Sequence, residues 1–239
     1  MTAPNTAPST APDLAAIPGT PWSDPLGSSF RSFRSFRLAP APGLHLGTDA
    51  TGRAVALPAP GPAGTRIGVL GDALFARLLA LRLLAVGARV TAATRTPEPW
   101  AGLVQAAGGR LDVAASVPAW PGRTPAPPTV DDGPQALVSD LRRPPSRATA
   151  NGPWRTVVHV ANAAPPRSGF WVAPDAVIVL DRRLAEAADR LLGAEEARTT
   201  ASLSPGEIAL FHPYGTHVLR VDVTPPEDAL LLAPGPPRA

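Results

Sequence analysis

Hydrophobic positions in residues 66–93 follow the pattern of a strand, a helix and a second strand. Short apolar runs open and close this stretch, at 66–70 and 89–93. The leucines between them recur every three or four residues, which predicts an amphipathic helix from Asp72 to Val86. Because the connections are short and contain glycine, the three elements predict a right-handed βαβ unit with parallel strands.

The rest of the chain continues this alternation. The further elements expected are a β-hairpin over 44–57, a helix over 98–107, strands at 111–113, 136–138, 156–160 and 176–180, a helix over 181–192, and a hairpin of 208–212 with 216–223. The predicted fold class is therefore α/β: a Rossmann-like or P-loop-like, mostly parallel sheet with flanking helices, preceded by a β-hairpin.

Proline and glycine, 32 and 21 of the 239 residues, divide the chain into segments. The first segment combines many prolines with few aliphatic side chains, which is typical of disorder. The segments expected are a proline-rich disordered tail with a Phe/Arg repeat over 1–42, a β-hairpin and linker over 43–60, an α/β nucleotide-binding-like domain over 61–232 with a proline-rich excursion at 114–134, and a tail over 233–239.

Two missing residue types exclude whole classes of chemistry. Without cysteine there is no disulfide, thiolate nucleophile or cysteine-ligated zinc. Without lysine there is no Schiff base and no phosphate-binding lysine of a P-loop. All 22 basic residues are therefore arginine, and the formal net charge is +3. Since the Phe/Arg repeat alone contains three arginines, the remainder has no net basic excess, and no nucleic-acid partner is expected.

The end of the strand at 66–70 is the candidate nucleotide site, because glycines there would let a phosphate approach the N-terminus of the next helix. The residues concerned are Gly68, Gly71, Asp72 and Arg95. Asp72 places a negative charge where a pyrophosphate would lie, whereas Arg95, after the second strand, suits a 2′-phosphate. We interpret the set as a vestigial site and expect no bound cofactor.

Other candidates have simpler structural interpretations. Asp181 follows an apolar run in the manner of a magnesium-binding strand, but it is expected to cap a helix. His212 and His217 flank a hairpin connection and are expected to face each other, yet two imidazoles without a third ligand rarely bind a metal. No metal site and no set of catalytic residues is expected, so the chain is not predicted to be an enzyme.

The Phe/Arg repeat admits two interpretations. Its interaction candidates are Phe30, Arg31, Phe33, Arg34, Phe36 and Arg37. In a helix, this period of three would place aromatic and basic side chains together, as suits an anionic membrane surface or a partner groove. The alternative is a strand or mobile arm whose repetition arose by slippage of the coding sequence.

The hairpin stretch 44–57, followed by 66–71 and a leucine-rich helix, resembles the lead-in to the ATPase core of FtsK/SpoIIIE-type translocases. Residues 78–91, with Thr96–Trp100, resemble cytosolic accessory proteins of actinobacterial type VII (ESX) secretion systems, including EccE-like components. The resemblance spans roughly residues 44–223. Because the glycine–lysine pair of the phosphate loop is missing, it implies a degenerate, non-hydrolysing relative.

The resemblance implies a non-catalytic, cytosolic accessory or structural subunit that docks on protein components of a membrane secretion or translocation assembly. The sequence shows neither a signal peptide nor a transmembrane segment, so a cytoplasmic location is expected, with peripheral contact at the inner face of the cell membrane. Two alternatives stay open. One is an NAD(P)-dependent Rossmann oxidoreductase, and the other is a peripheral membrane or nucleic-acid binder that acts through the Phe/Arg repeat.

Overall fold

Ten strands and five α-helices make up the part of the chain that this computed structural model describes, residues 43–120, 123–129 and 133–232. The strands are β1 Leu44–Asp49, β2 Ala54–Leu57, β3 Thr65–Leu70, β4 Arg89–Ala93, β5 Leu111–Ala114, β6 Gln135–Ser139, β7 Arg155–Ala161, β8 Ala176–Val179, β9 Glu207–His212 and β10 Gly215–Val221. The α-helices are α1 Ala73–Ala85, α2 Ala101–Ala107, α3 Ala185–Leu191, α4 Ala194–Ala201 and α5 Pro225–Leu232. Three 3-10 turns are η1 Glu98–Trp100, η2 Arg147–Ala150 and η3 Arg182–Leu184.

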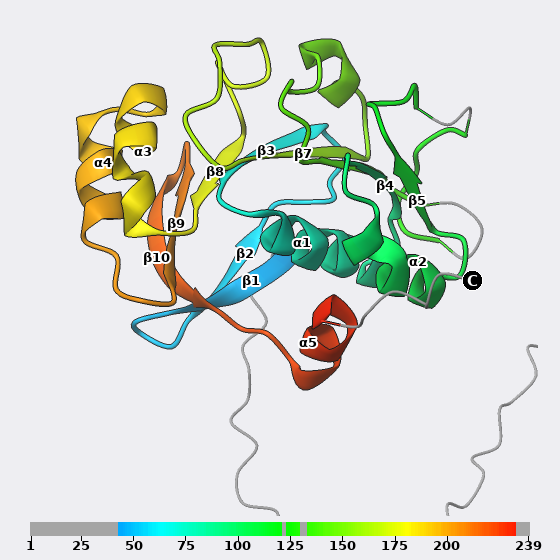
Figure 1. Ribbon diagram of the computed structural model, residues 1–239, viewed down its shortest axis with the longest axis horizontal. Coiled ribbons are helices and arrows are strands. Elements are labelled where there is room, and N and C mark those ends of the chain that lie inside the picture. The colour runs from blue at the N-terminus through cyan, green and yellow to red at the C-terminus, as the bar shows by residue number, and fades with distance from the viewer. Residues whose placement is uncertain (1–42, 121–122, 130–132, 233–239) are drawn as a thin grey trace, which may run out of the picture. The chain divides into compact units, whose positions relative to one another are not determined.

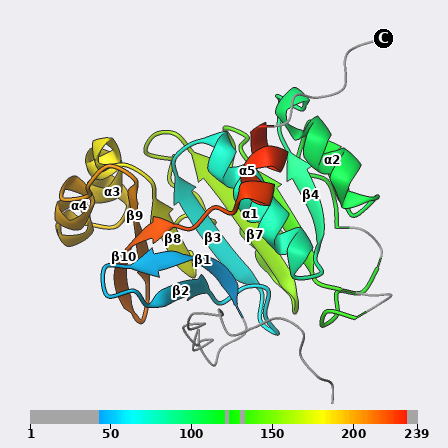
Figure 2. The same ribbon diagram turned by 90° about the horizontal axis from the view of Figure 1, so that it is seen from below.

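All ten strands join in one mixed sheet in the order β2-β1-β10-β9-β8-β3-β7-β6-β4-β5 (Figures 1 and 2). The six strands from β8 to β5 run parallel to one another. The four strands from β2 to β9 are added to β8 by antiparallel pairing. The hairpin β1–β2 is thus part of the main sheet, because β1 pairs with β10 from the far end of the chain.

The expected α/β fold class is confirmed, and the expected strands lie within a few residues of their predicted positions. Two helices, α4 and α5, were not expected from the sequence. The interpretations of 1–42, including the Phe/Arg repeat, and of 233–239 concern segments outside the described residues. Within the part of the chain described, no helix is long and apolar enough to cross a membrane.

Two hydrophobic cores lie on opposite faces of the sheet. Helices α1, α2 and α5 cover one face, while α3, α4 and the loop between β7 and β8 cover the other (Figure 1). Burial on both faces explains why the central parallel strands are continuous apolar runs. Helix α1 is apolar nearly all round because the sheet lies on one side of it and α5 on the other.

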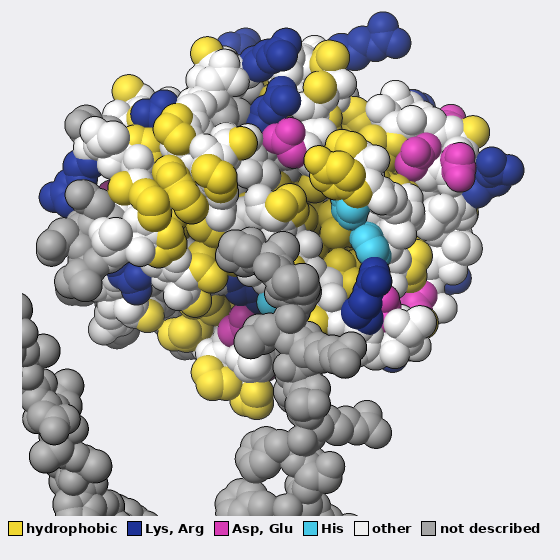
Figure 3. Space-filling view, turned by 180° about the vertical axis from the view of Figure 1, so that it is seen from behind, with side chains coloured by type: hydrophobic (Ala, Val, Ile, Leu, Met, Phe, Trp, Pro, Cys, Tyr) yellow, Lys and Arg dark blue, Asp and Glu magenta, His cyan; other side chains and the backbone are white. Residues whose placement is uncertain are grey.

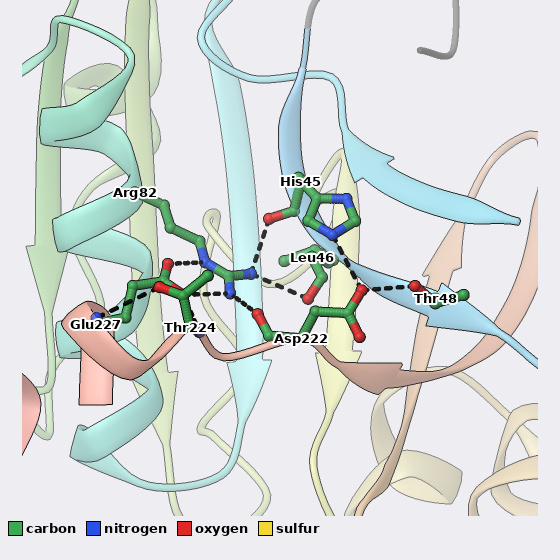
Figure 4. Close-up of polar contacts among 7 residues, drawn as sticks. All are labelled: His45, Leu46, Thr48, Arg82, Asp222, Thr224 and Glu227. Atoms are coloured by element: carbon green, nitrogen blue, oxygen red, sulfur yellow. Dashed lines mark hydrogen bonds and ion pairs between the residues drawn. The ribbon is translucent and has the colours of Figure 1, made fainter. Parts of the chain in front are cut away.

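One charged side chain, Arg82, lies inside this packing, and it is only 7% exposed. Its guanidinium group donates to the carbonyl oxygens of His45 and Leu46 in β1, at 2.8 and 2.9 Å, and to the carbonyl of Asp222 after β10 (Figure 4). Nε also donates to Oε1 of Glu227 in α5 at 2.8 Å. A single arginine of α1 therefore joins β1, the end of β10 and α5.

Glu227 also caps the helix that carries it. The backbone N–H of Thr224 donates to Glu227 Oε2 at 2.8 Å, and the N–H of Glu227 donates back to Thr224 Oγ1 at 3.4 Å, which is a capping box. Burial alone would raise the pKa of Glu227, but the hydrogen bonds and charge of Arg82, with those of Thr224, outweigh burial and hold this pKa below its usual value.

We predict that Arg82→Leu lowers the free energy of unfolding by about 3 kcal/mol, because the carboxylate of Glu227 and three carbonyl oxygens lose their donor. Because the pKa of Glu227 is lowered on folding, its stabilising contribution is complete above pH 4.5 and is lost as the pH falls below that value. Urea unfolding between pH 7 and pH 3 measures both effects. Arg190→Leu, which removes an exposed pair with Glu186, is the control and changes stability by less than about 0.5 kcal/mol. Equal losses in the two variants would contradict the role of Arg82.

Candidate functional site

A crevice of about 1480 Å³ runs along the carboxyl ends of the parallel strands. Its walls come from the segments that directly follow β3, β4, β5, β6 and β7. Adjacent strands β3 and β7 send their connections to opposite faces of the sheet: α1 follows β3 on one face, and the loop 162–175 follows β7 on the other. Ligands of open α/β sheets bind where the connections diverge in this way.

Three arginines and two aspartates are the charged side chains of this crevice. Arg95 follows β4, and Arg142 and Arg143 follow β6; all three are exposed, and Asp72 and Asp140 belong to the same lining. Figure 3 shows dark-blue arginine side chains gathered on the side of the molecule where Figure 1 places η2 and the loop 162–175. The lining also holds hydroxyl and amide groups, those of Thr96, Ser116, Ser146, Thr149 and Asn162.

Asp140 is the carboxylate with the most unusual environment in the crevice. It comes directly after β6, is half-buried, and accepts a hydrogen bond from Thr94 Oγ1 at 2.9 Å. Burial raises the pKa of Asp140 above its usual value, and the hydrogen bond from Thr94 offsets this only in part. A carboxyl group of this kind can exchange a proton with a ligand or stand beside a cation at the site.

The structure separates the four residues proposed from the sequence as a vestigial nucleotide site. Gly71, Asp72 and Arg95 line the crevice, but Gly68 does not. A Cβ atom on Gly68 would lie 2.3 Å from the ring of Trp171, and one on Gly71 would lie 2.2 Å from the side chain of Leu180. Both glycines therefore make room for neighbouring side chains, which is a packing role.

Asp72, where the sequence predicted the helix to begin, is the N-cap of α1. Its Oδ1 accepts from the backbone N–H of Phe75 at 3.0 Å. Only Gly71 and Asp72 separate β3 from α1, so the strand passes into the helix almost directly. The helix N-terminus that faces the crevice thus already has a carboxylate bound to one of its free N–H groups.

The remaining candidates lie outside the crevice lining. Asp181 caps η3 by accepting from the N–H of Arg183 at 2.8 Å, as expected. His212 and His217 stack with ring centroids 5.2 Å apart, and His212 Nδ1 accepts from the N–H of Tyr214. Among the described residues, no group of three or more histidine, cysteine, aspartate and glutamate side chains is arranged to hold a metal ion.

Sequence reasoning did not assign four ionisable residues to the crevice, namely Asp140, Arg142, Arg143 and His159. A signal for the first three was present, since they directly follow the apolar run at 136–138. The carboxyl ends of parallel strands share one edge of a sheet, so residues directly after each such run are candidates for a common site. His159 lies within a strand, and nothing in its local sequence distinguishes it from a core residue.

No protein-family model and no curated protein matches the sequence. Among solved structures, the genome packaging NTPase from Sulfolobus turreted icosahedral virus 2, in complex with AMPPCP, is similar with a TM-score of 0.46 and 8% identity, over 67% of this chain and 99% of that chain. The pCW3 conjugation coupling protein TcpA has a TM-score of 0.46 and 10% identity, over 79% of this chain and 68% of that chain. The cytoplasmic domain of the Thermomonospora curvata type VII secretion ATPase EccC has a TM-score of 0.45 and 13% identity, over 84% of this chain and 32% of that chain.

These neighbours are FtsK/HerA-type P-loop NTPases of DNA packaging, conjugation and type VII secretion, and the likeness is one of α/β fold. The expectation that the chain is not an enzyme is contradicted by this finding, because the fold is shared with ATPases. The sequence reasoning relied on the missing P-loop lysine and on the lack of a recognisable set of catalytic residues, and neither of these reports on the fold. No neighbour supports the EccE-like assignment in particular.

Proposed function

We propose that the crevice at the carboxyl edge of the sheet binds a phosphate-bearing ligand of nucleotide size. The observation that carries the proposal is that Arg95, Arg142 and Arg143 line one crevice from two different strand ends. Guanidinium groups match phosphate oxygens in both charge and bidentate geometry. A volume of about 1480 Å³ leaves room for a base and a sugar beside the phosphates.

The arginines, rather than the N-terminus of α1, would hold the phosphates. Asp72 occupies the helix N-terminus with its carboxylate, which repels an anion and competes for the N–H group of Phe75. Arg142 and Arg143 lie one and two residues beyond Leu141 at the opposite wall. The half-buried Asp140 would stand beside the bound phosphates, where its raised pKa suits proton exchange.

We predict that Arg142→Ser/Arg143→Ser weakens binding of ATP about tenfold or more, because each charge-assisted hydrogen bond contributes roughly 1.5–3 kcal/mol. Isothermal titration calorimetry with ATP, ADP, NADPH and inorganic pyrophosphate measures the effect and shows whether adenine or nicotinamide contributes. Arg182→Ser/Arg183→Ser removes two arginines outside the crevice lining and is the matched control. Undetectable binding of all four ligands to the unmodified chain would contradict the proposed function.

We also predict that Asp72→Asn tightens binding of the same ligand severalfold. Asparagine still caps a helix, so α1 keeps its N-terminal hydrogen bond while the repulsive charge is removed. Asp181→Asn, at the N-cap of η3, is the matched control and leaves the affinity unchanged. Calorimetry in parallel with thermal unfolding distinguishes binding from stability. Weaker binding in Asp72→Asn than in the unmodified chain would show that Asp72 assists the ligand.

A second proposal concerns the setting in which the chain works. The sequence resemblance over 44–57 and 66–71, and over 78–91 with Thr96–Trp100, supports a place beside protein components of a membrane secretion assembly. The first of these stretches forms the hairpin β1–β2 that the resemblance implies. An EccE-like identity and contact with an anionic membrane surface through the Phe/Arg repeat remain hypotheses from the sequence. We expect crosslinking in native cells to link the chain to an identified secretion component. If the chain crosslinks to other proteins but to no secretion component, this setting is contradicted.

A further inference from the structure

Two loops that wall the crevice are joined through one buried histidine. The indole Nε1–H of Trp171, from the loop after β7, donates to His159 Nδ1 at 3.0 Å. His159 Nε2–H donates in turn to the carbonyl oxygen of Leu141, after β6, at 2.8 Å. The side chains of His159 and Trp171 are almost fully buried, with residue exposures of 1% and 3%. A continuous chain of hydrogen bonds therefore crosses from one crevice wall to the other.

This arrangement fixes the protonation state of His159. An indole nitrogen can only donate and a carbonyl oxygen can only accept, so Nδ1 must be unprotonated and Nε2 must carry the hydrogen. A second proton on Nδ1 would point at the indole N–H and break that bond. Burial lowers the pKa of His159 below its usual value, and the hydrogen bond to Leu141 offsets this only in part.

The positions of the rings are fixed by packing. Gly68 of β3 is the register partner of His159 in β7, and the absence of a side chain at Gly68 makes room for the ring of Trp171. His159 and Trp171 pack edge to face at a centroid distance of 5.6 Å, and Phe170 packs against both at 5.7 Å. The indole is thus held where its N–H meets His159, and Gly68 contributes by leaving space for the ring.

We propose that His159 is a positioning residue, which holds the Arg142–Arg143 segment in place for a phosphate-bearing ligand as long as its ring is neutral. The inference rests on the proposed function. The carbonyl that His159 holds belongs to Leu141, the residue directly before Arg142, so the hydrogen bond fixes the start of the arginine segment. Protonation of the ring breaks the link to Trp171, and the ring then binds the Leu141 carbonyl without being anchored to the loop after β7.

Any test must distinguish the pH response of His159 from that of the other ionisable groups of the crevice. They are Asp72 after β3, Arg95 after β4, and Asp140, Arg142 and Arg143 after β6. The packed rings of Phe170 and Trp171 carry no titratable group. His159→Gln keeps a donor and an acceptor but does not titrate, so it reports the pH response of all the other groups and of the ligand itself.

The test combines Trp171→Phe, which keeps an aromatic ring over Gly68 but removes the donor, with nitrogen NMR of the histidine ring in the full chain. In the unmodified protein at pH 7.5 we expect the neutral Nε2–H tautomer of His159. In Trp171→Phe we expect the ring to gain its second proton at a higher pH than in the unmodified protein, because Nδ1 no longer accepts from the indole N–H. We also expect hydrogen exchange over 141–150 to be several times faster, and ATP affinity at pH 7.5 to fall about fivefold.

Trp100→Phe, which alters a buried indole on the α1 face, is the matched control and changes none of these measurements. Between pH 7.5 and pH 5.5, affinity should fall more steeply in Trp171→Phe than in His159→Gln. A His159 that titrates near pH 6.5 in the unmodified chain, or unchanged exchange over 141–150 in Trp171→Phe, would overturn the inference.

If the unmodified chain binds no phosphate compound, the proposed function fails, while the tautomer and exchange measurements still decide the role of His159. The tautomer measurement needs no variant and stands even if Trp171→Phe does not fold.

Discussion

The buried guanidinium group of Arg82 is the interaction on which the arrangement of the fold depends. A charge at 7% exposure is tolerated only when its donors are matched by acceptors, and here three carbonyl oxygens and the carboxylate of Glu227 supply them. These partners come from the first strand, from the segment after the last strand and from the last helix. Segments far apart in the sequence are therefore held against α1, and α1 presents Asp72 to the crevice.

A different kind of constraint holds the opposite face. There the aromatic rings of His159, Phe170 and Trp171 pack edge to face over Gly68, and directional hydrogen bonds from Trp171 and to Leu141 fix their orientation. One face thus depends on a buried ion pair and the other on a neutral imidazole. The crevice lies at the edge of the sheet where the loops of both faces meet.

The local pattern was sufficient to predict the central strands and α1, because strands buried on both faces are apolar throughout and because Asp72 and Gly87 lie at the ends of α1. Helix α5 was not predicted, although Thr224 and Glu227 form a capping box with two prolines between them, in the first turn of the helix. Helix α4 begins after Gly193 with no side-chain cap and carries only one buried residue, so its sequence contains little helical signal.

The crevice was less predictable than the fold, because its residues come from five strand ends whose order in the sheet no local pattern reveals. The sequence pointed to Gly71, Asp72 and Arg95, which do line the crevice, whereas the fourth residue of that set, Gly68, lies outside the lining and against the ring of Trp171. The other acidic candidate, Asp181, follows β8, which two strands, β3 and β7, separate from β6 and the half-buried Asp140. The missing lysine, on which the sequence reasoning relied, does not exclude an enzyme built on this fold.

The most direct measurement of the central claim is the amide NMR spectrum of the full chain during titration with ATP. A phosphate-bearing ligand in the crevice should shift the resonances of 94–96, 140–146 and 159–164, and leave those of the hairpin β9–β10 and of α3 unchanged. Shifts confined to β9–β10, or no shifts at millimolar ATP, would contradict the assignment of the crevice as the binding site.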